Sequence, residues 1–188
     1  QNMYDTSVKV PCIIAQPGRI PAGQLSHAML SGYDVFPTIV DYLGLAHAPG
    51  RRKPGHSFRP VLEGNGPGAD AAVVVYDEYG PVRMVRTAEW KYVHRHPDGP
   101  HELFHLSDDP GERRNLIDDP AAAATAGTLR ARLDDWFRAY VNPARDGVDK
   151  GVTGCGQLGR VEDARAAHPV FADQHLTGAD WDLWMAQN

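Results

Sequence analysis

The stretch VRMVRTAEWKYVHRHPDGPHELFHL, residues 82–106, decides the fold of this chain. It holds three runs rich in β-branched and aromatic residues, Val82–Arg86, Trp90–Arg95 and Glu102–Leu106, and Ala71–Tyr76 upstream is a fourth. The connections between the runs are short, which favours antiparallel pairing, because a parallel crossover needs about a dozen residues or more. The sequence therefore predicts a small four-stranded antiparallel sheet.

A helix after these strands is predicted to cover the sheet. Asp119 suits the N-cap position, and Pro120 follows at the first helical position, where its missing N–H costs nothing. Between Ala121 and Val141, apolar side chains recur at helical spacing and form one stripe, Leu129, Leu133, Trp136, Phe137 and Tyr140. Such a stripe has to pack on another layer, and the sheet is the nearest one.

The N-terminal third has a different character. Val8–Ala15 is a continuous apolar run, typical of a strand covered on both faces in a parallel sheet, with partner strands expected from sequence outside this chain. Ser31, with Asp34 three residues later, predicts the start of a helix that Gly44 ends. This part therefore looks like the end of an α/β domain.

Composition suggests where the chain divides. A Gly-, Pro- and Arg-rich connector runs from 49 to 68. We expect an α/β part at 1–64, the sheet and its helix at 65–142, and a Gly-rich, Trp-containing tail at 143–188 that serves contacts in a homo-oligomer. The fold class is α/β, as a fragment of α+β character.

Charge and cysteine content exclude several partners. The formal net charge of −5 provides no basic field for nucleic acid or an anionic membrane, and no apolar run approaches the roughly 20 residues that span a bilayer. Cys12 and Cys155 lie far apart and form no disulfide framework, which favours free thiols in a reducing compartment such as the cytoplasm. We expect neither a nucleic-acid nor a membrane partner.

Two motifs suggest other chemistry. His101–His105 reads HELFH and matches the HExxH signature of zinc proteases, but on a strand its two histidines would lie roughly 13 Å apart, too far to share a zinc ion. Gly154–Gly159 matches GxGxxG without the strand that should precede it. The acidic pairs are explained by a turn, a helix cap and a solvent-facing helix surface: Asp108–Asp109, Asp118–Asp119 and Asp134–Asp135.

Two segments resemble the sulfatase family of the alkaline-phosphatase-like superfamily. Asn2–Thr38 is similar to the stretch that follows the active-site lysine of sulfatases, and a set of short motifs resembles their C-terminal subdomain: WKY at 90–92, ELFHL at 102–106, DPGE at 109–112 and NL at 115–116. The choline-sulfatase-like and arylsulfatase-like bacterial branch is the nearest. The resemblance implies the last strand and helix of an alkaline-phosphatase-like α/β domain, followed by a four-stranded antiparallel sheet packed on a C-terminal helix.

The resemblance also implies a parent enzyme that hydrolyses a small sulfate ester. Its cofactors would be a divalent ion, usually calcium, and a formylglycine made from the first residue of a Cys/Ser-x-Pro-x-Arg motif. Neither Cys12 nor Cys155 lies in that motif, so we assign no catalytic or metal-binding residue to this chain. The cofactor sites would belong to an N-terminal catalytic half, which is the expected partner, and the chain alone is expected to be inactive.

By analogy with sulfatases in which a histidine near the end of the corresponding strand reaches the substrate, His94, His96 and His101 are candidates for the rim of the substrate pocket. Their alternative role is that of solvated turn residues. The family's usual Tyr-Asp at the end of the next strand is Phe104-His105 here, which keeps an aromatic packing residue and replaces the carboxylate. A non-catalytic binding or assembly module, or a pseudoenzyme remnant, is the alternative function, and an HExxH zinc protease is a remote one.

Overall fold

The computed structural model describes residues 2–46, 53–65, 72–77, 80–143 and 146–148. Within them the elements are α1 (Asp5–Val8), α2 (Gly32–Tyr42), α3 (Arg59–Leu62), β1 (Val73–Tyr76), β2 (Val82–Arg86), β3 (Trp90–Arg95), β4 (Glu102–His105), the 3-10 helix η1 (Pro120–Ala122) and α4 (Ala123–Tyr140). The predicted tail from 149 onward, with Cys155 and Gly154–Gly159, lies outside the described residues. No helix in the described ranges has the length and apolar character that crossing a membrane requires.

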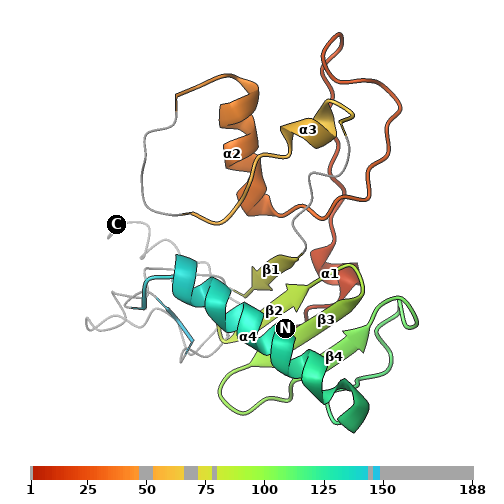
Figure 1. The fold of residues 1–188 in the computed structure, drawn as a ribbon, viewed down its shortest axis with the longest axis vertical. Coiled ribbons are helices and arrows are strands. Elements are labelled where there is room, and N and C mark those ends of the chain that lie inside the picture. Colours follow the sequence, from red (N-terminus) through yellow and green to blue (C-terminus); the bar gives the residue numbers. More distant parts are fainter. Residues whose placement is uncertain (1, 47–52, 66–71, 78–79, 144–145, 149–188) are drawn as a thin grey trace, which may run out of the picture.

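The four strands form one antiparallel sheet in chain order, which confirms the predicted topology (Figure 1). Val85 pairs with Tyr92, and Tyr92 pairs with Leu103. Because strand side chains alternate between faces, these three residues and Val74 of β1 lie on the same side of the sheet.

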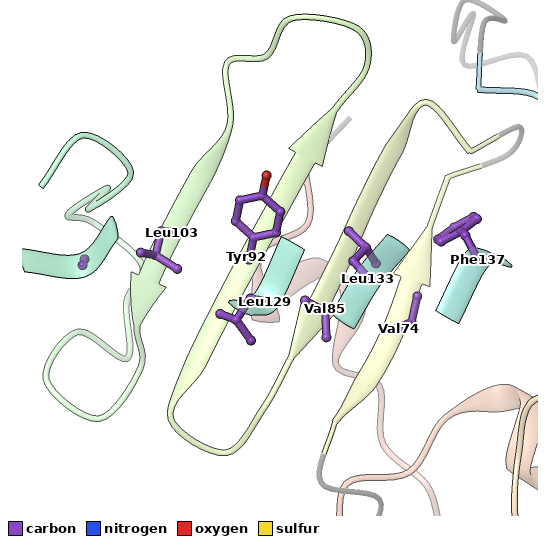
Figure 2. Close-up of a cluster of buried hydrophobic side chains, with 8 residues drawn as sticks. Val74, Val85, Tyr92, Leu103, Leu129, Leu133 and Phe137 are labelled. Atoms are coloured by element: carbon purple, nitrogen blue, oxygen red, sulfur yellow. The ribbon is translucent and has the colours of Figure 1, made fainter. Parts of the chain in front are cut away.

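Helix α4 covers that side of the sheet, as the apolar stripe predicts. Figure 2 shows one buried cluster in which β1 to β4 and α4 all take part: Val74, Val85, Tyr92, Leu103, Leu129, Leu133 and Phe137. Trp136 packs at the edge of the cluster. The predicted cap is also present, because the Asp119 carboxylate accepts a hydrogen bond from the N–H of Ala121 at 2.9 Å.

The predicted helix in the N-terminal part is present as α2, which lies with α3 away from the sheet (Figure 1). Ser31 and Asp34 form the capping box expected from their spacing, and Gly44 follows the helix with a φ of 63°. The Asp34 carboxylate also accepts a hydrogen bond from the N–H of His56 at 2.9 Å, so the helix start anchors the returning chain.

The predicted strand at Val8–Ala15 is wrong for the described chain. Residues 5–8 form α1, residues 9–16 form neither helix nor strand, and Ile13 is 91% exposed. A strand forms where a neighbour takes up its backbone N–H and C=O groups, and the four-stranded sheet pairs only its own members. The apolar run alone could not supply that neighbour.

The N-terminal segment instead covers the second side of the sheet. Met3 packs against a small apolar cluster formed by β2 and β3, Val82, Met84 and Val93. At the edge of this cluster Tyr4 contacts Phe104, with ring centroids 6.0 Å apart, so Phe104 keeps the packing role expected of an aromatic residue there.

Lys91 of β3 holds this segment in place by charge. Its side chain is completely buried, and its ammonium lies 2.9 Å from the carbonyl oxygen of Met3 and 2.5 Å from carboxylate oxygens of both Asp5 and Glu112. Glu112 also accepts a hydrogen bond from the N–H of Asp5 at 2.6 Å. A buried ammonium needs such partners, because the lost hydration costs several kcal/mol.

Arg86 adds a second cation to this network. Its guanidinium contacts both carboxylate oxygens of Asp5, at 3.0 to 3.3 Å. Burial alone raises the pKa of Asp5, but the hydrogen bonds and charges of Arg86 and Lys91 outweigh burial and hold that pKa below its ordinary value. Asp5 is therefore charged at neutral pH.

Replacing Lys91 by Met should destabilise the chain by about 3–5 kcal/mol, because the buried Glu112 carboxylate would lose its counter-charge. The free energy of unfolding in urea measures the loss. In a double-mutant cycle, Glu112→Gln should cost less in the Lys91→Met background than in the wild type. Exposed Lys9→Met is the control and should change stability by less than about 0.5 kcal/mol. Strictly additive losses would contradict the coupling.

Candidate functional site

Three histidines meet at the hairpin that joins β3 to β4. His94 lies near the end of β3, His96 directly follows that strand, and His101 directly precedes β4. The ring of His94 stacks on that of His101, with centroids 4.2 Å apart and planes at 20°, and meets the ring of His96 edge-on at 4.4 Å. The structure therefore brings together all three histidines singled out in the sequence.

Hydrogen bonds orient two of the rings. The hydroxyl of Tyr92 lies 2.9 Å from Nδ1 of His94, and the backbone N–H of Arg95 donates to Nδ1 of His101 at 3.3 Å. Because Nδ1 of His101 accepts, the neutral ring carries its proton on Nε2. His101 thus presents an N–H donor on the opposite side of the ring.

The surroundings of His94 and His101 lower the pKa of both imidazoles, which are therefore neutral at pH 7. Burial is the main cause that lowers the pKa of His94 to about 4, and four neighbouring groups lower it further: His101, His96, Arg130 and Arg83. Burial also lowers the pKa of His101, and Arg130 and Arg95 act in the same direction against the opposing charge of Asp98. His94 and His101 are therefore neutral rings whose charged neighbours are mainly cations.

Two of the cations near the cluster have anionic partners. Arg83, whose Cα pairs in register with that of His94, forms an ion pair with Asp146 and lies 3.7 Å from the centroid of the Phe137 ring. Arg95 forms an ion pair with Glu102 at 2.9 Å. Arg130 differs from both, because it is exposed and makes no ion pair with any residue in the described ranges.

The HExxH segment does not form a zinc site. It lies on β4, as expected, with His101 turned to His94 while His105 contacts Trp90 at a centroid distance of 4.4 Å and Asp108 at 2.7 Å. Among the described residues, no group of three His, Cys, Asp or Glu side chains is arranged to hold a metal ion. A calcium site like that implied by the resemblance therefore does not fit the described part of the chain.

The acidic pairs have structural roles where the structure describes them. The Asp109 carboxylate accepts hydrogen bonds from the N–H groups of Arg113 and Arg114 at 2.7 and 2.8 Å, which closes the turn after β4. Asp119 caps η1, and the pair at 134–135 is exposed on α4. These outcomes agree with the roles expected from the sequence.

Sequence reasoning missed the roles of two motif residues. The sequence predicts that Lys91 lies in a strand, but it does not show that Lys91 is the centre of an ion network. The signal for this role is a lysine between aromatic residues in a predicted strand, because a buried lysine needs a charged partner. Asn115 bridges the chain after the turn to β4, since its Oδ1 accepts from the N–H of Leu103 and its Nδ2 donates to the carbonyl of His101. The second bond also fixes the end of the hairpin that carries the cluster.

Comparisons with known proteins assign the family. The family model for the C-terminal region of N-sulphoglucosamine sulphohydrolase matches residues 1–139. A Delta 4,5-hexuronate-2-O-sulfatase from Bacteroides thetaiotaomicron is 35% identical over 145 residues, covering 72% of this chain and 30% of the relative. A choline-sulfatase from Rhizobium meliloti is 33% identical over 137 residues, covering 71% and 26%. The chain thus spans less than a third of the length of either relative.

A solved structure shares the arrangement. The phosphonate monoester hydrolase from Silicibacter pomeroyi superposes with a TM-score of 0.53 at 25% identity, covering 72% of this chain and 29% of that one. The family match covers the N-terminal segment, the sheet and nearly all of α4, the parts whose packing is described above. On this evidence the chain belongs to the sulfatase family and is a C-terminal sulfatase domain.

Proposed function

We propose that this chain is the part of a sulfate-ester hydrolase that supports the catalytic domain and forms one rim of its substrate pocket. His94, His96 and His101 are the rim residues. The observation that carries the proposal is the convergence of the three rings on one hairpin, with an N–H donor on Nε2 of His101. The Nε2–H of a neutral imidazole can donate a hydrogen bond to an oxygen of a sulfate ester.

The calcium ion and the formylglycine of such an enzyme would lie in an N-terminal portion of the parent protein. Cys12 is exposed and is followed by Ile13, Ile14 and Ala15 rather than by the maturation motif. In the whole enzyme the formylglycine would supply the nucleophile and the metal would neutralise charge on the ester. The residues of this chain would bind and orient the substrate.

An exposed apolar surface provides a place for the N-terminal portion to dock. Four large side chains lie on one face of α2 and are 44% to 59% exposed: Val35, Phe36, Ile39 and Leu43. Val10, Ile13 and Leu25 are exposed in the segment before α2. Contiguous apolar surface on a folded chain marks an interface, and the relatives are more than three times as long as the part matched here. We infer that the N-terminal portion of the parent protein covers this apolar surface, and that it corresponds to the N-terminal part of these relatives.

The isolated chain should show no sulfatase activity. Purified in calcium buffer, it should leave nitrophenyl sulfate unhydrolysed, because neither cysteine lies in a formylglycine motif. Release of nitrophenol measures turnover, with an active sulfatase as the positive control. Metal-dependent turnover by the pure chain would overturn the assignment of the chemistry to another part of the enzyme.

In a full-length enzyme that contains this chain, His101→Ala should lower kcat/KM about 10- to 100-fold, the loss expected for one hydrogen bond to a charged group. His105→Ala is the matched control, because His105 follows on the same strand but contacts Trp90 and Asp108 instead of the cluster. The control should leave kcat/KM unchanged. Equal effects of the two substitutions would argue against a rim role for the cluster.

Acid should destabilise the chain through His94. Its pKa is about 4 in the folded chain and ordinarily about 6.5, so the unfolded state binds the extra proton between these values and stability falls as pH drops through this window. His94→Gln should therefore show a shallower decline in unfolding free energy between about pH 7 and pH 4.5. Urea unfolding at several pH values measures both slopes. Parallel curves would show that His94 does not titrate as its surroundings imply.

A further inference from the structure

The hydroxyl of Tyr92 is buried under α4 and forms one hydrogen bond with a residue that the structure describes. Tyr92 is 2% exposed, and its ring belongs to the apolar cluster between the sheet and α4 (Figure 2). His94 lies two positions further along β3, on the same side of the sheet, and its Nδ1 is 2.9 Å from that hydroxyl. Because a buried polar group needs a partner, this contact decides how the Tyr92 hydroxyl is satisfied.

The direction of the hydrogen bond follows from the burial of the hydroxyl. If Nδ1 of His94 donated, the phenolic proton of Tyr92 would need a second acceptor, and within the described ranges the hydroxyl has no other hydrogen-bond partner. Burial also raises the pKa of Tyr92, so the phenol keeps its proton at neutral pH. The hydroxyl therefore donates to Nδ1, and the neutral ring of His94 carries its own proton on Nε2.

The ring of His94 supports the ring of His101. The two rings stack with centroids 4.2 Å apart and planes at 20°, and His94 is 4% exposed whereas His101 is half-buried. Nδ1 of His101 is an acceptor as well, from the N–H of Arg95 at 3.3 Å. Both stacked rings are therefore in the same Nε2–H tautomer, and a ligand reaches His101 more readily than the buried ring beside it.

We propose that Tyr92 is a positioning residue of the histidine cluster: its hydroxyl holds His94 in the neutral Nε2–H tautomer, and the stacked ring of His94 orients His101. Tyr92 is too deeply buried to touch a substrate, so it acts through the two imidazoles. Protonation of His94 would turn the acceptor at Nδ1 into a donor, so the hydroxyl also opposes a positive charge beside His101. The hydrogen bond and the tautomer stand by themselves, whereas an effect on turnover rests on the proposed rim role.

The first test is NMR of the imidazole ring nitrogens in the 188-residue chain at neutral pH. In the wild type, His94 should show an unprotonated Nδ1 and a protonated Nε2. Tyr92→Phe removes only the hydroxyl and should move the Nδ1 signal of His94 toward that of an imidazole with mixed tautomers. A wild-type ring that is protonated on Nδ1, or the same Nδ1 signal in both chains, would overturn the proposal.

Tyr92→Phe should also raise the pKa of His94 by about half a unit to one unit, because one hydrogen bond to the neutral ring is lost. The charged and titratable groups that act on His94 from β2, α4 and the hairpin are the same in both chains: Arg83, Arg130, His96 and His101. The change is therefore assigned to the hydroxyl. An NMR titration of the His94 ring measures it, and an unchanged or lower pKa would contradict the proposal.

Tyr76→Phe is the matched control. Tyr76 lies on β1, and its ring contacts Trp136 and Phe137 rather than the histidines. This variant should leave the Nδ1 signal and the pKa of His94 unchanged, and equal effects of the two substitutions would count against a specific role of Tyr92. Urea midpoints show whether both variants are folded, and the wild-type tautomer tests the hydrogen bond without any variant.

Turnover by a full-length enzyme that contains this chain separates the inference from the rim role. Tyr92→Phe should lower kcat/KM about three- to tenfold, less than His101→Ala, because the His101 donor is misaligned rather than removed. If His101→Ala leaves turnover unchanged while the NMR results hold, the rim role fails and the hydrogen bond and tautomer stand. If His101→Ala slows turnover and Tyr92→Phe does not, the rim role stands and the positioning role of Tyr92 fails.

Discussion

The buried ammonium of Lys91 is the constraint on which the position of the N-terminal segment depends. A fully buried lysine is tolerated only when carboxylates and carbonyls replace its water, and here Met3, Asp5 and Glu112 do so. One charge thus joins α1, β3 and the turn after β4. Glu112 reaches it with a φ of 53°, which is uncommon for a residue other than glycine, so the ion pair and the bond to Asp5 also hold a strained backbone.

This network also gives a physical reason for motifs that look unrelated in the sequence. Lys91 belongs to the WKY motif, Glu112 to DPGE and Asp5 to the N-terminal segment, and the buried charges of Lys91 and Glu112 are paired only because these segments meet. Asn115 of the NL motif also joins two segments. Its side-chain amide accepts a hydrogen bond from the N–H of Leu103 in β4 and donates one to the carbonyl of His101. Family motifs in this part of the chain are therefore mainly structural.

The histidine cluster is the part of the described structure for which we propose a place at the rim of the substrate pocket. The rings of His94 and His101 are held by a hydroxyl and a backbone N–H, kept neutral mainly by burial, and placed at the hairpin between β3 and β4. Family membership does not by itself name the ester, because the same arrangement occurs in a phosphonate monoester hydrolase.

The amino-acid sequence by itself determined the elements whose partners are close in the chain. The sheet and α4 were predicted from the strand-like run Trp90–Arg95 and from the helical stripe between Leu129 and Tyr140, because these patterns arise from residues a few positions apart. The short motifs predicted the family. The apolar run at Val8–Ala15 was misassigned, since a strand exists only where another strand accepts its hydrogen bonds.

Only the tertiary structure decided which side chains meet. Asp5 lies 86 positions from Lys91, and no local pattern records that the two form an ion pair. The stacking of His94 on His101 likewise follows from the pairing of β3 and β4. Electrostatic fields act through space rather than along the chain, so the chemistry of the site became visible only in the folded protein.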